Sequence, residues 1–297
     1  MESSALITIG LPSALAIIMF GLGLTLTIGD FRRIGRSPRA VLVALALQLF
    51  ALPALAFGLI ELFDLAPLLA IGMMLLAASP GGTTANLYSH LFRGDVALNI
   101  TLTAINAVLA AITVPIITNF AIGYFGADGE VGLQFGKVVQ VIAIVLAPVA
   151  IGMIVRRFSP AFATAADRPV RIFSVGVLAL VSVGALVAER DDVADYARQV
   201  GLVTALFCLS SLALGYTGAR LLRLARPQAI ATSMEVGIHN TAVAMTIALS
   251  VLESSEAAIP AAVYSVLMYV LAAAFGFLIT RTDRAADDSV DRVPAVH

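Results

Sequence analysis

Nine apolar segments, each long enough to cross a bilayer, constrain this chain more than any other feature of its sequence. A helix needs about 20 apolar residues to span the hydrocarbon core, and lipid cannot satisfy free backbone N–H and C=O groups. The residue-by-residue alternation of a membrane β-barrel is missing. We therefore expect an all-α polytopic membrane protein with about nine transmembrane helices. The segments are 5–28, 40–60, 67–92, 96–124, 135–156, 171–188, 197–222, 228–252 and 259–280.

The composition excludes several classes of protein. Hydrophobic residues make up 60% of the chain and charged residues 12%, with a mean hydropathy of +0.99. A typical soluble domain is about 25% charged. A soluble enzyme, a nucleic-acid-binding protein and a disordered chain are therefore not expected, and the lipid bilayer is the expected surrounding.

The basic residues predict how the chain sits in the membrane. With nine spans, 15 of the 18 Lys and Arg residues fall on one side, beginning with the loop that contains Arg32 and Arg39. That side is the cytoplasm by the positive-inside rule. We therefore expect an inner (plasma) membrane protein with its N-terminus outside. Its C-terminus, a polar tail over 281–297, is then cytoplasmic.

Two of the nine segments are interrupted at matching positions. The third segment breaks at 79–84 and the eighth breaks at 235–240. Aligning the breaks pairs the first four segments with the last four in opposite orientation and leaves the fifth unpaired. Inverted repeats with broken helices are typical of secondary transporters, so we expect the two breaks to cross at mid-membrane.

One acidic residue and one polar stripe are expected to lie deep in the bilayer. Glu235 has no Lys or Arg at comparable depth, and a carboxylate placed there indicates a functional site. It would bind a cation or relay a proton; the alternative is a protonated side chain that only joins helices. Asn99, Thr103 and Asn106 share one helix face, which suits a hard cation such as Na⁺ or, alternatively, interhelical hydrogen bonds.

The residues around the breaks indicate an anion site. Pro80, Gly81 and Gly82 open the helix, so that Thr83 and Thr84 begin a half-helix with free N–H groups, which attract negative charge. Asn240 and His239 lie at the second break, where each could contact a substrate or serve packing alone. Gln48 lies in an apolar span and is either a packing amide or part of the site.

At these positions the chain resembles the bile acid:sodium symporter family over nearly its whole length. The similarity is specific at Ser79 to Asn86, at Arg93 to Leu98 with the stripe that follows, and at Glu235 to Asn240. The resemblance implies a nine-span member that lacks the family's usual first helix. It also implies a panel domain (5–28 and 135–188) and a core domain (40–124 and 197–280).

The resemblance further implies two Na⁺ sites behind the crossing. Ala85 stands where the family has serine, and His239 stands where it has glutamine, so the sequence leaves one or two ions open, or a proton in place of the second. The first site would use Asn86, Asn99, Thr103 and Glu235. The second would use Gln48, Glu235 and backbone carbonyls near Val236 and Ile238.

Together these features predict a secondary active transporter that couples Na⁺ to the uptake of a small organic anion by alternating access. Thr83, Thr84, Asn240 and His239 would bind the anion. The alternatives are a proton-coupled or uncoupled anion carrier and, outside transport, a channel or a ligand sensor. Motifs of membrane proteases and of P-loop ATPases are absent from the sequence, so an enzyme is not expected. The identity of the substrate, the direction of transport and the oligomeric state are left open.

Overall fold

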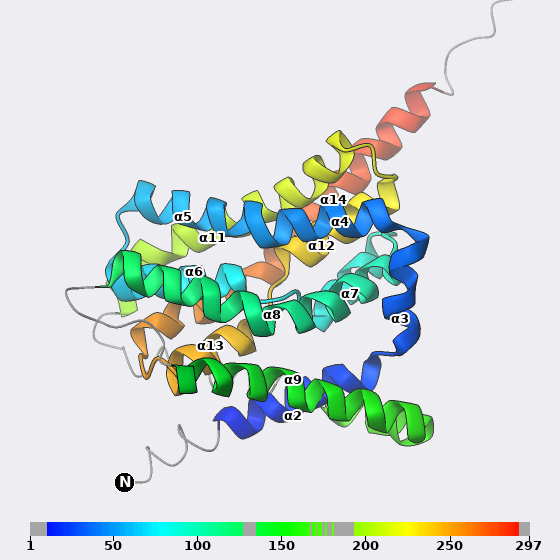
Figure 1. Ribbon diagram of the computed structural model, residues 1–297. Coiled ribbons are helices and arrows are strands. Elements are labelled where there is room, and N and C mark those ends of the chain that lie inside the picture. The colour runs from blue at the N-terminus through cyan, green and yellow to red at the C-terminus, as the bar shows by residue number, and fades with distance from the viewer. Residues whose placement is uncertain are drawn as a thin grey trace, which may run out of the picture.

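The computed structural model describes residues 11–126, 135–166, 168–170, 172, 173, 176, 180 and 193–290. Within these residues the chain folds into α-helices, with no β-strand (Figure 1). The helices are α2 (Leu11–Thr25), α3 (Ile28–Arg32), α4 (Pro38–Ala46), α5 (Leu52–Phe63), α6 (Pro67–Ala78), α7 (Thr83–Leu91), α8 (Val96–Phe125), α9 (Phe135–Phe158), α11 (Val193–Leu221), α12 (Arg226–Gly237), α13 (Thr241–Ser250) and α14 (Ile259–Val290).

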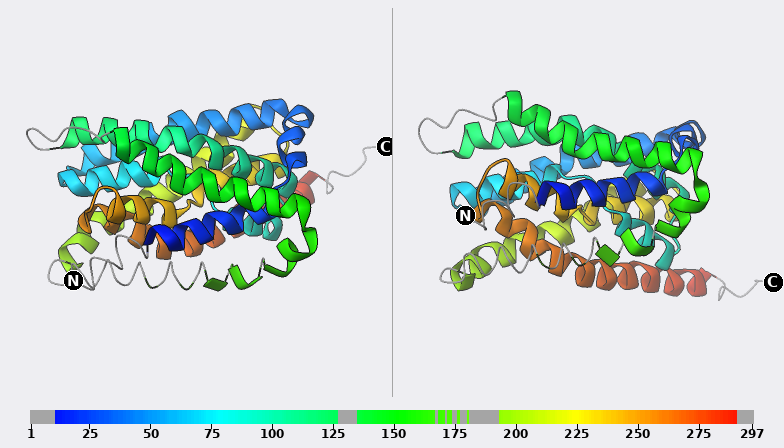
Figure 2. Two further views of the ribbon diagram at one scale, coloured as in Figure 1. Left: turned by 60° about the horizontal axis from the view of Figure 1, so that its bottom comes forward. Right: turned by 90° about the horizontal axis from the view of Figure 1, so that it is seen from below.

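The helices confirm an all-α polytopic membrane protein. Among the described residues, four helical stretches are long and apolar enough to cross a membrane: Pro38–Phe63, Val96–Phe125, Val200–Leu221 and Glu256–Arg281. A fifth arises if the pair Pro12–Thr25 and Ile28–Arg36, bent by 65°, is counted as one span. Most helices run along one common direction, as in a bundle that crosses a bilayer (Figure 2). The predicted span 171–188 lies almost entirely outside the described residues, so the count of nine stays a prediction.

The second predicted span contains an irregular turn that the sequence analysis did not anticipate. Residues Leu47–Ala51 form a π-helical turn between α4 and α5, in which the Leu52 N–H bonds to the Leu47 carbonyl. Pro53 follows directly and has no N–H to donate to the carbonyl of Leu49, and its ring would crowd that carbonyl in a regular α-helix. The wider turn accommodates the proline and places Gln48 inside it.

The third and eighth segments are broken within the predicted ranges, although each break is shorter than predicted. α6 ends at Ala78 and α7 begins at Thr83, while α12 ends at Gly237 and α13 begins at Thr241. The two breaks pair as antiparallel backbone through a bridge between Gly81 and His239. The Gly82 N–H donates to the Ile238 carbonyl (3.1 Å), and the Asn240 N–H donates to the Pro80 carbonyl (2.8 Å). The breaks therefore cross and satisfy each other's backbone groups, which lipid would leave unpaired.

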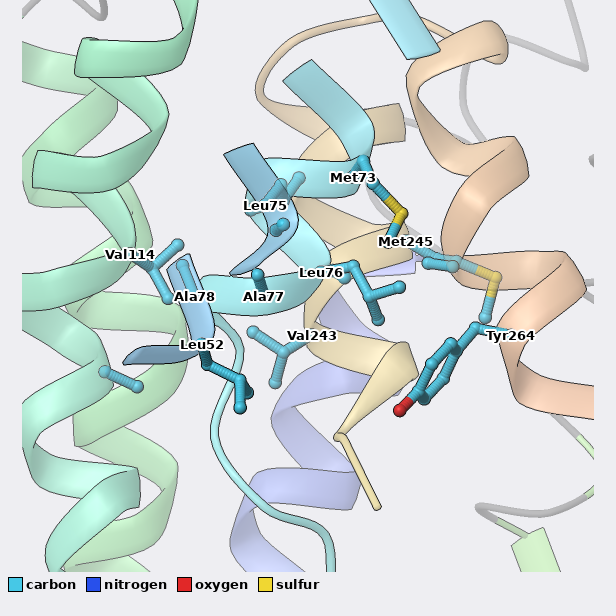
Figure 3. Close-up of a cluster of buried hydrophobic side chains, with 14 of the residues drawn as sticks. Leu52, Met73, Leu75, Leu76, Ala77, Ala78, Val114, Val243, Met245 and Tyr264 are labelled. Atoms are coloured by element: carbon cyan, nitrogen blue, oxygen red, sulfur yellow. The ribbon is translucent and has the colours of Figure 1, made fainter. Parts of the chain in front are cut away.

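A buried apolar cluster surrounds this crossing. α6 is buried from Leu69 to its end at Ala78, as expected for a helix that is apolar on every face. Its side chains meet Val243 and Met245 of α13 and Tyr264 of α14 (Figure 3). This packing fixes α6 and α13, the two helices that lead into and out of the breaks.

Helices α2 and α9 form a separate pair at the edge of the bundle (Figures 1 and 2). A side chain on Gly23 would overlap the backbone of Val149, and one on Gly152 would overlap the backbone of Phe20. Such small residues let membrane helices approach closely. The pair joins parts of the two predicted panel segments, and the division into panel and core stays a prediction. α14 continues to Val290, so the predicted tail over 281–297 begins as a continuation of this helix.

Candidate functional site at the helix crossing

Glu235 lies in the last turn of α12, just before the second break, and is only 1% exposed. Three side chains of α8 donate hydrogen bonds to its carboxylate. Asn99 Nδ2 and Thr103 Oγ1 donate to Oε2, at 2.6 and 2.8 Å, and Asn106 Nδ2 donates to Oε1 at 2.9 Å. The polar stripe predicted on this helix therefore faces Glu235.

The carboxylate is held without a cationic side chain. Within the described part of the chain, no Lys or Arg forms an ion pair with Glu235. Gly81 of the first break lies against the carboxylate, and a Cβ atom at this position would overlap it. All three polar neighbours are donors, which suits a carboxylate that only accepts. The site thus contains a buried acceptor with neutral partners, and among the described residues no cationic side chain pairs with it.

Four amide oxygens, two of them on side chains that contact Glu235, are buried without a hydrogen-bond partner. Buried polar atoms are normally paired, so unpaired ones are candidate positions for a ligand or a water molecule. Oxygen ligands of this kind suit hard cations. The atoms are Asn99 Oδ1, Asn106 Oδ1, Gln48 Oε1 and Asn86 Oδ1. Of the residues predicted for the first ion site, Asn99 and Thr103 contact Glu235, whereas no contact of Asn86 with Glu235 is found.

A second group of polar contacts forms at the carbonyl of Ser79. Gln48 Nε2 donates to it from the π-helical turn (3.3 Å), and His239 Nδ1 lies 3.2 Å from it. A carbonyl is an acceptor, so His239 carries its proton on Nδ1 in this contact. Gln48, predicted for the second ion site, and His239, predicted for the substrate site, thus contact the same backbone carbonyl. This carbonyl is free because α6 ends at the first break.

His239 is buried, unlike the other residues predicted to bind substrate. Its ring stacks on Phe207 with centroids 5.6 Å apart and meets Tyr264 edge-on at 5.4 Å. Its Nε2 has no partner. Thr83 is exposed, and Thr84 and Asn240 are half-buried.

The two half-helices that follow the breaks begin differently. At α13, Asn240 Oδ1 accepts from the Val243 N–H at 3.4 Å, so the side chain caps its own helix. At α7 the corresponding residue is Gly82, which offers no side chain. The Gly82 carbonyl accepts from Ala85 N–H, and the first turn of α7 has no side-chain cap. Free N–H groups at a helix N-terminus form a site for an anion.

The backbone atoms predicted as ion ligands lie at the crossing. Val236 is buried in the last turn of α12, and the Ile238 carbonyl already accepts from the Gly82 N–H. A carbonyl oxygen has a second lone pair, so this bond does not exclude a further ligand.

Tyr264 also belongs to this region, although it was not predicted from the sequence. Its hydroxyl donates to the Gly237 carbonyl at the end of α12 (2.9 Å), and Cys208 Sγ lies 4.0 Å from the same oxygen. A tyrosine within an apolar span needs a partner for its hydroxyl, which is the signal that was available. The carbonyl that it reaches is free only because α12 stops there.

The comparisons with known proteins show which family the chain is similar to. Residues 12–195 match the family described as the Sodium Bile acid symporter family. An uncharacterised sodium-dependent transporter of Bacillus subtilis is 30% identical over 253 residues, covering 85% of this chain and 77% of the relative. A probable sodium/metabolite cotransporter of the Arabidopsis thaliana chloroplast is 29% identical over 86% of this chain and 63% of its own length. The ileal sodium/bile acid cotransporter of Homo sapiens is 24% identical over 82% of this chain and 70% of its own length.

Proposed function

Because the chain belongs to the Sodium Bile acid symporter family, we propose that it moves a small organic anion together with Na⁺ into the cell. The protein is a multi-pass membrane transporter of a sodium-coupled family and not an enzyme. We further propose that it lies in the inner (plasma) membrane with an outer N-terminus and a cytoplasmic C-terminus, an orientation that the distribution of basic residues supports.

The observation that supports a Na⁺ site best is the buried carboxylate of Glu235. It accepts three bonds from α8, and the described residues leave its charge without a cationic partner. The unpaired oxygens of Asn99 and Asn106 lie on the side chains that contact it. A carboxylate with neutral oxygen ligands fits a hard monovalent ion. In our proposal Glu235, Asn99 and Thr103 bind the ion, with Asn86 as a further ligand.

A second ion is proposed between Gln48, Glu235 and the end of α12. Gln48 Oε1 is buried without a partner there, and the backbone near Val236 and Ile238 supplies carbonyl oxygens. His239 shares the Ser79 carbonyl with Gln48. Because an imidazole nitrogen is a poor ligand for Na⁺, the proposal requires one ion and accommodates a second.

The anion would bind at the start of α7. Thr83 is exposed, the first turn has no side-chain cap, and the helix dipole adds positive potential. Thr84 and the Nδ2 of Asn240 would complete the site. His239 would form its wall on the side of the crossing. A carboxylate of an organic acid is the group that these donors suit.

The two sites are joined by the bonds between the breaks. Gly82, the residue before α7, donates to Ile238, three residues after Glu235. An ion that stabilises one arrangement of the crossing therefore also fixes the position of the N–H groups at the start of α7. Binding of the ion then changes the affinity for the anion, which is what coupling requires. Movement of the core (40–124 and 197–280) against the panel (5–28 and 135–188) would then expose the crossing to each side in turn.

Thermal stability in detergent tests the ion site without knowledge of the substrate. The melting temperature would be measured in NaCl, KCl and choline chloride at matched ionic strength. A bound ion stabilises the folded state by roughly 1.4 kcal/mol at ten times its Kd. We expect a rise specific to Na⁺ that Glu235→Gln abolishes. The absence of a Na⁺-specific rise in the wild-type protein would refute the ion site.

A matched pair of threonines on α8 serves as the control. Thr101 and Thr103 are both buried, and each hydroxyl contacts the carbonyl four residues earlier, but only Thr103 also reaches Glu235. Thr103→Val should weaken the Na⁺-dependent rise, whereas Thr101→Val should leave it intact. Equal losses in the two variants would show that the effect comes from the helix and not from the site.

Uptake into proteoliposomes separates the alternatives. A panel of radiolabelled carboxylates, bile acids included, would be offered with an inward Na⁺ gradient, with a pH gradient alone, and with no gradient. Uptake that needs the Na⁺ gradient supports the proposal. Uptake driven by the pH gradient without Na⁺ would indicate proton coupling, and currents far above carrier turnover would indicate a channel.

A further inference from the structure

Asn106 forms a hydrogen bond with one oxygen of the Glu235 carboxylate. Its Nδ2 donates to Oε1, while Asn99 and Thr103 share Oε2. The residue is 3% exposed and lies on α8, three positions after Thr103. The four residues that the family resemblance names for the first ion site do not include it, so its role rests on this geometry.

Only one end of the Asn106 side-chain amide has a hydrogen-bond partner. Its NH₂ group faces the carboxylate, and its Oδ1 is buried without a partner. The amide of Asn99 shows the same arrangement on the other carboxylate oxygen. An amide carries donors on one side and acceptors on the other, and rotation about χ2 exchanges them with little torsional cost. Each of these asparagines therefore fits a bare carboxylate with one face and a cation with the other.

We propose that Asn106 is a ligand of the coupling cation through Oδ1, and that its amide turns from donor to ligand when the ion binds. This inference rests on the proposed function, because it assigns a further residue to that ion site. Without the ion, the NH₂ group stabilises the charge of Glu235. With the ion, Oδ1 is added to the oxygens around it, so that Asn106 helps to set the affinity and selectivity for the cation.

Asn106→Asp separates a ligand from a residue that only donates to Glu235. The carboxylate has nearly the shape of the amide but supplies oxygens only. In choline chloride it should lower the melting temperature, because two carboxylates then face each other. If Asn106 is a ligand, the variant keeps a Na⁺-dependent rise larger than that of the wild-type protein. It should also gain a rise in CaCl₂, since paired carboxylates favour Ca²⁺.

Two further variants complete the experiment. Asn106→Leu keeps the approximate size and removes both polar atoms, and it should raise the apparent Kd for Na⁺ by about tenfold or more. Asn119→Asp introduces the same carboxylate on the same helix, about 20 Å further along at 1.5 Å per residue. It should leave the Na⁺ response unchanged and gain no response to CaCl₂.

The outcomes distinguish this inference from the proposed function. A wild-type protein without a Na⁺-specific rise would overturn both. A wild-type rise that is lost in Asn106→Asp, with no response to CaCl₂, would overturn only the inference and leave Asn106 as a donor to Glu235. If Asn106→Leu does not fold, the comparison of Asn106→Asp with Asn119→Asp still decides the question.

Discussion

The two helix breaks cross each other but contribute different chemistry. The first break supplies space and backbone: Gly81 leaves room for the Glu235 carboxylate, and the Ser79 carbonyl receives Gln48 and His239. The second break supplies the charge of Glu235 and the side chain that caps its own half-helix. α7 begins without a side-chain cap, whereas α13 begins with one.

This difference indicates that the two breaks have different roles. They pair at one crossing, which satisfies the backbone groups of both breaks. The side chains then make the pair unequal, so that one break is suited to a cation and the other keeps free N–H groups for an anion. Substitutions at four positions test this comparison, from the largest expected effect to the smallest.

Gly81→Ala should have the largest effect. The added Cβ would overlap the Glu235 carboxylate, which three hydrogen bonds hold in place, and the Gly81 backbone is fixed by its bridge to His239. We expect a loss of about 1–3 kcal/mol in stability from overpacking, and loss of the Na⁺-dependent rise in melting temperature.

Gly82→Ala is the matched control for that variant. A Cβ at Gly82 would meet its nearest atom, the His239 carbonyl oxygen, at an ordinary 3.6 Å. Its φ of −96° is accessible to alanine. Stability and the Na⁺ response should therefore stay near those of the wild-type protein. If both alanine variants behave alike, the first break does not provide room for the carboxylate as we describe.

Tyr264→Phe tests how firmly the second break is held. The substitution removes the hydroxyl that donates to the Gly237 carbonyl and keeps the ring that packs on Phe207 and His239. A buried carbonyl left without its donor costs about 1–3 kcal/mol, and we place this variant at the lower end. Thermal unfolding in choline chloride measures the loss. A melting temperature unchanged from the wild-type protein would mean that the hydroxyl does not stabilise the break.

Asn240→Ala should have a smaller effect, because the capping bond to Val243 is long at 3.4 Å. Loss of such a cap costs about 0.5–2 kcal/mol, and the lower half of this range is expected. Asn240→Asp keeps the capping oxygen and removes Nδ2, so it separates the two proposed roles. If Asn240 also binds the anion, Asn240→Asp keeps the melting temperature and raises KM for the transported carboxylate. An unchanged KM would limit Asn240 to capping.

The sequence predicts the breaks and the main polar residues because these depend on local chemistry. Clustered proline and glycine favour a helix break, although the single prolines Pro115 and Pro148 lie inside helices. A carboxylate in an apolar span must have partners, which the stripe on α8 provides. Both breaks and the contact of Asn99 and Thr103 with Glu235 are found in the structure. The use of these residues in ion binding stays a prediction.

Other parts of the site depend on atoms that become free only after folding. The Ser79 and Gly237 carbonyls accept side chains because the helices stop beside them, and no residue type marks such atoms in the sequence. The π-helical turn at Gln48 follows from Pro53, yet its consequence for Gln48 depends on how α4 and α5 pack. The burial of His239 between two aromatic rings likewise follows from tertiary packing.

Gly82→Ser should change stability least and tests the difference between the breaks most directly. Serine at this position would give α7 the side-chain cap that Asn240 gives α13, and its oxygen would accept an N–H from the first turn. Serine exceeds glycine as a cap by only a few tenths of a kcal/mol, so a slight rise in melting temperature is expected. If the anion binds to these N–H groups, the serine oxygen competes with it and KM for the carboxylate rises. Gly82→Ala adds the same Cβ without the oxygen and should leave KM unchanged. A KM that is equal in the two variants would place the anion elsewhere than at the start of α7.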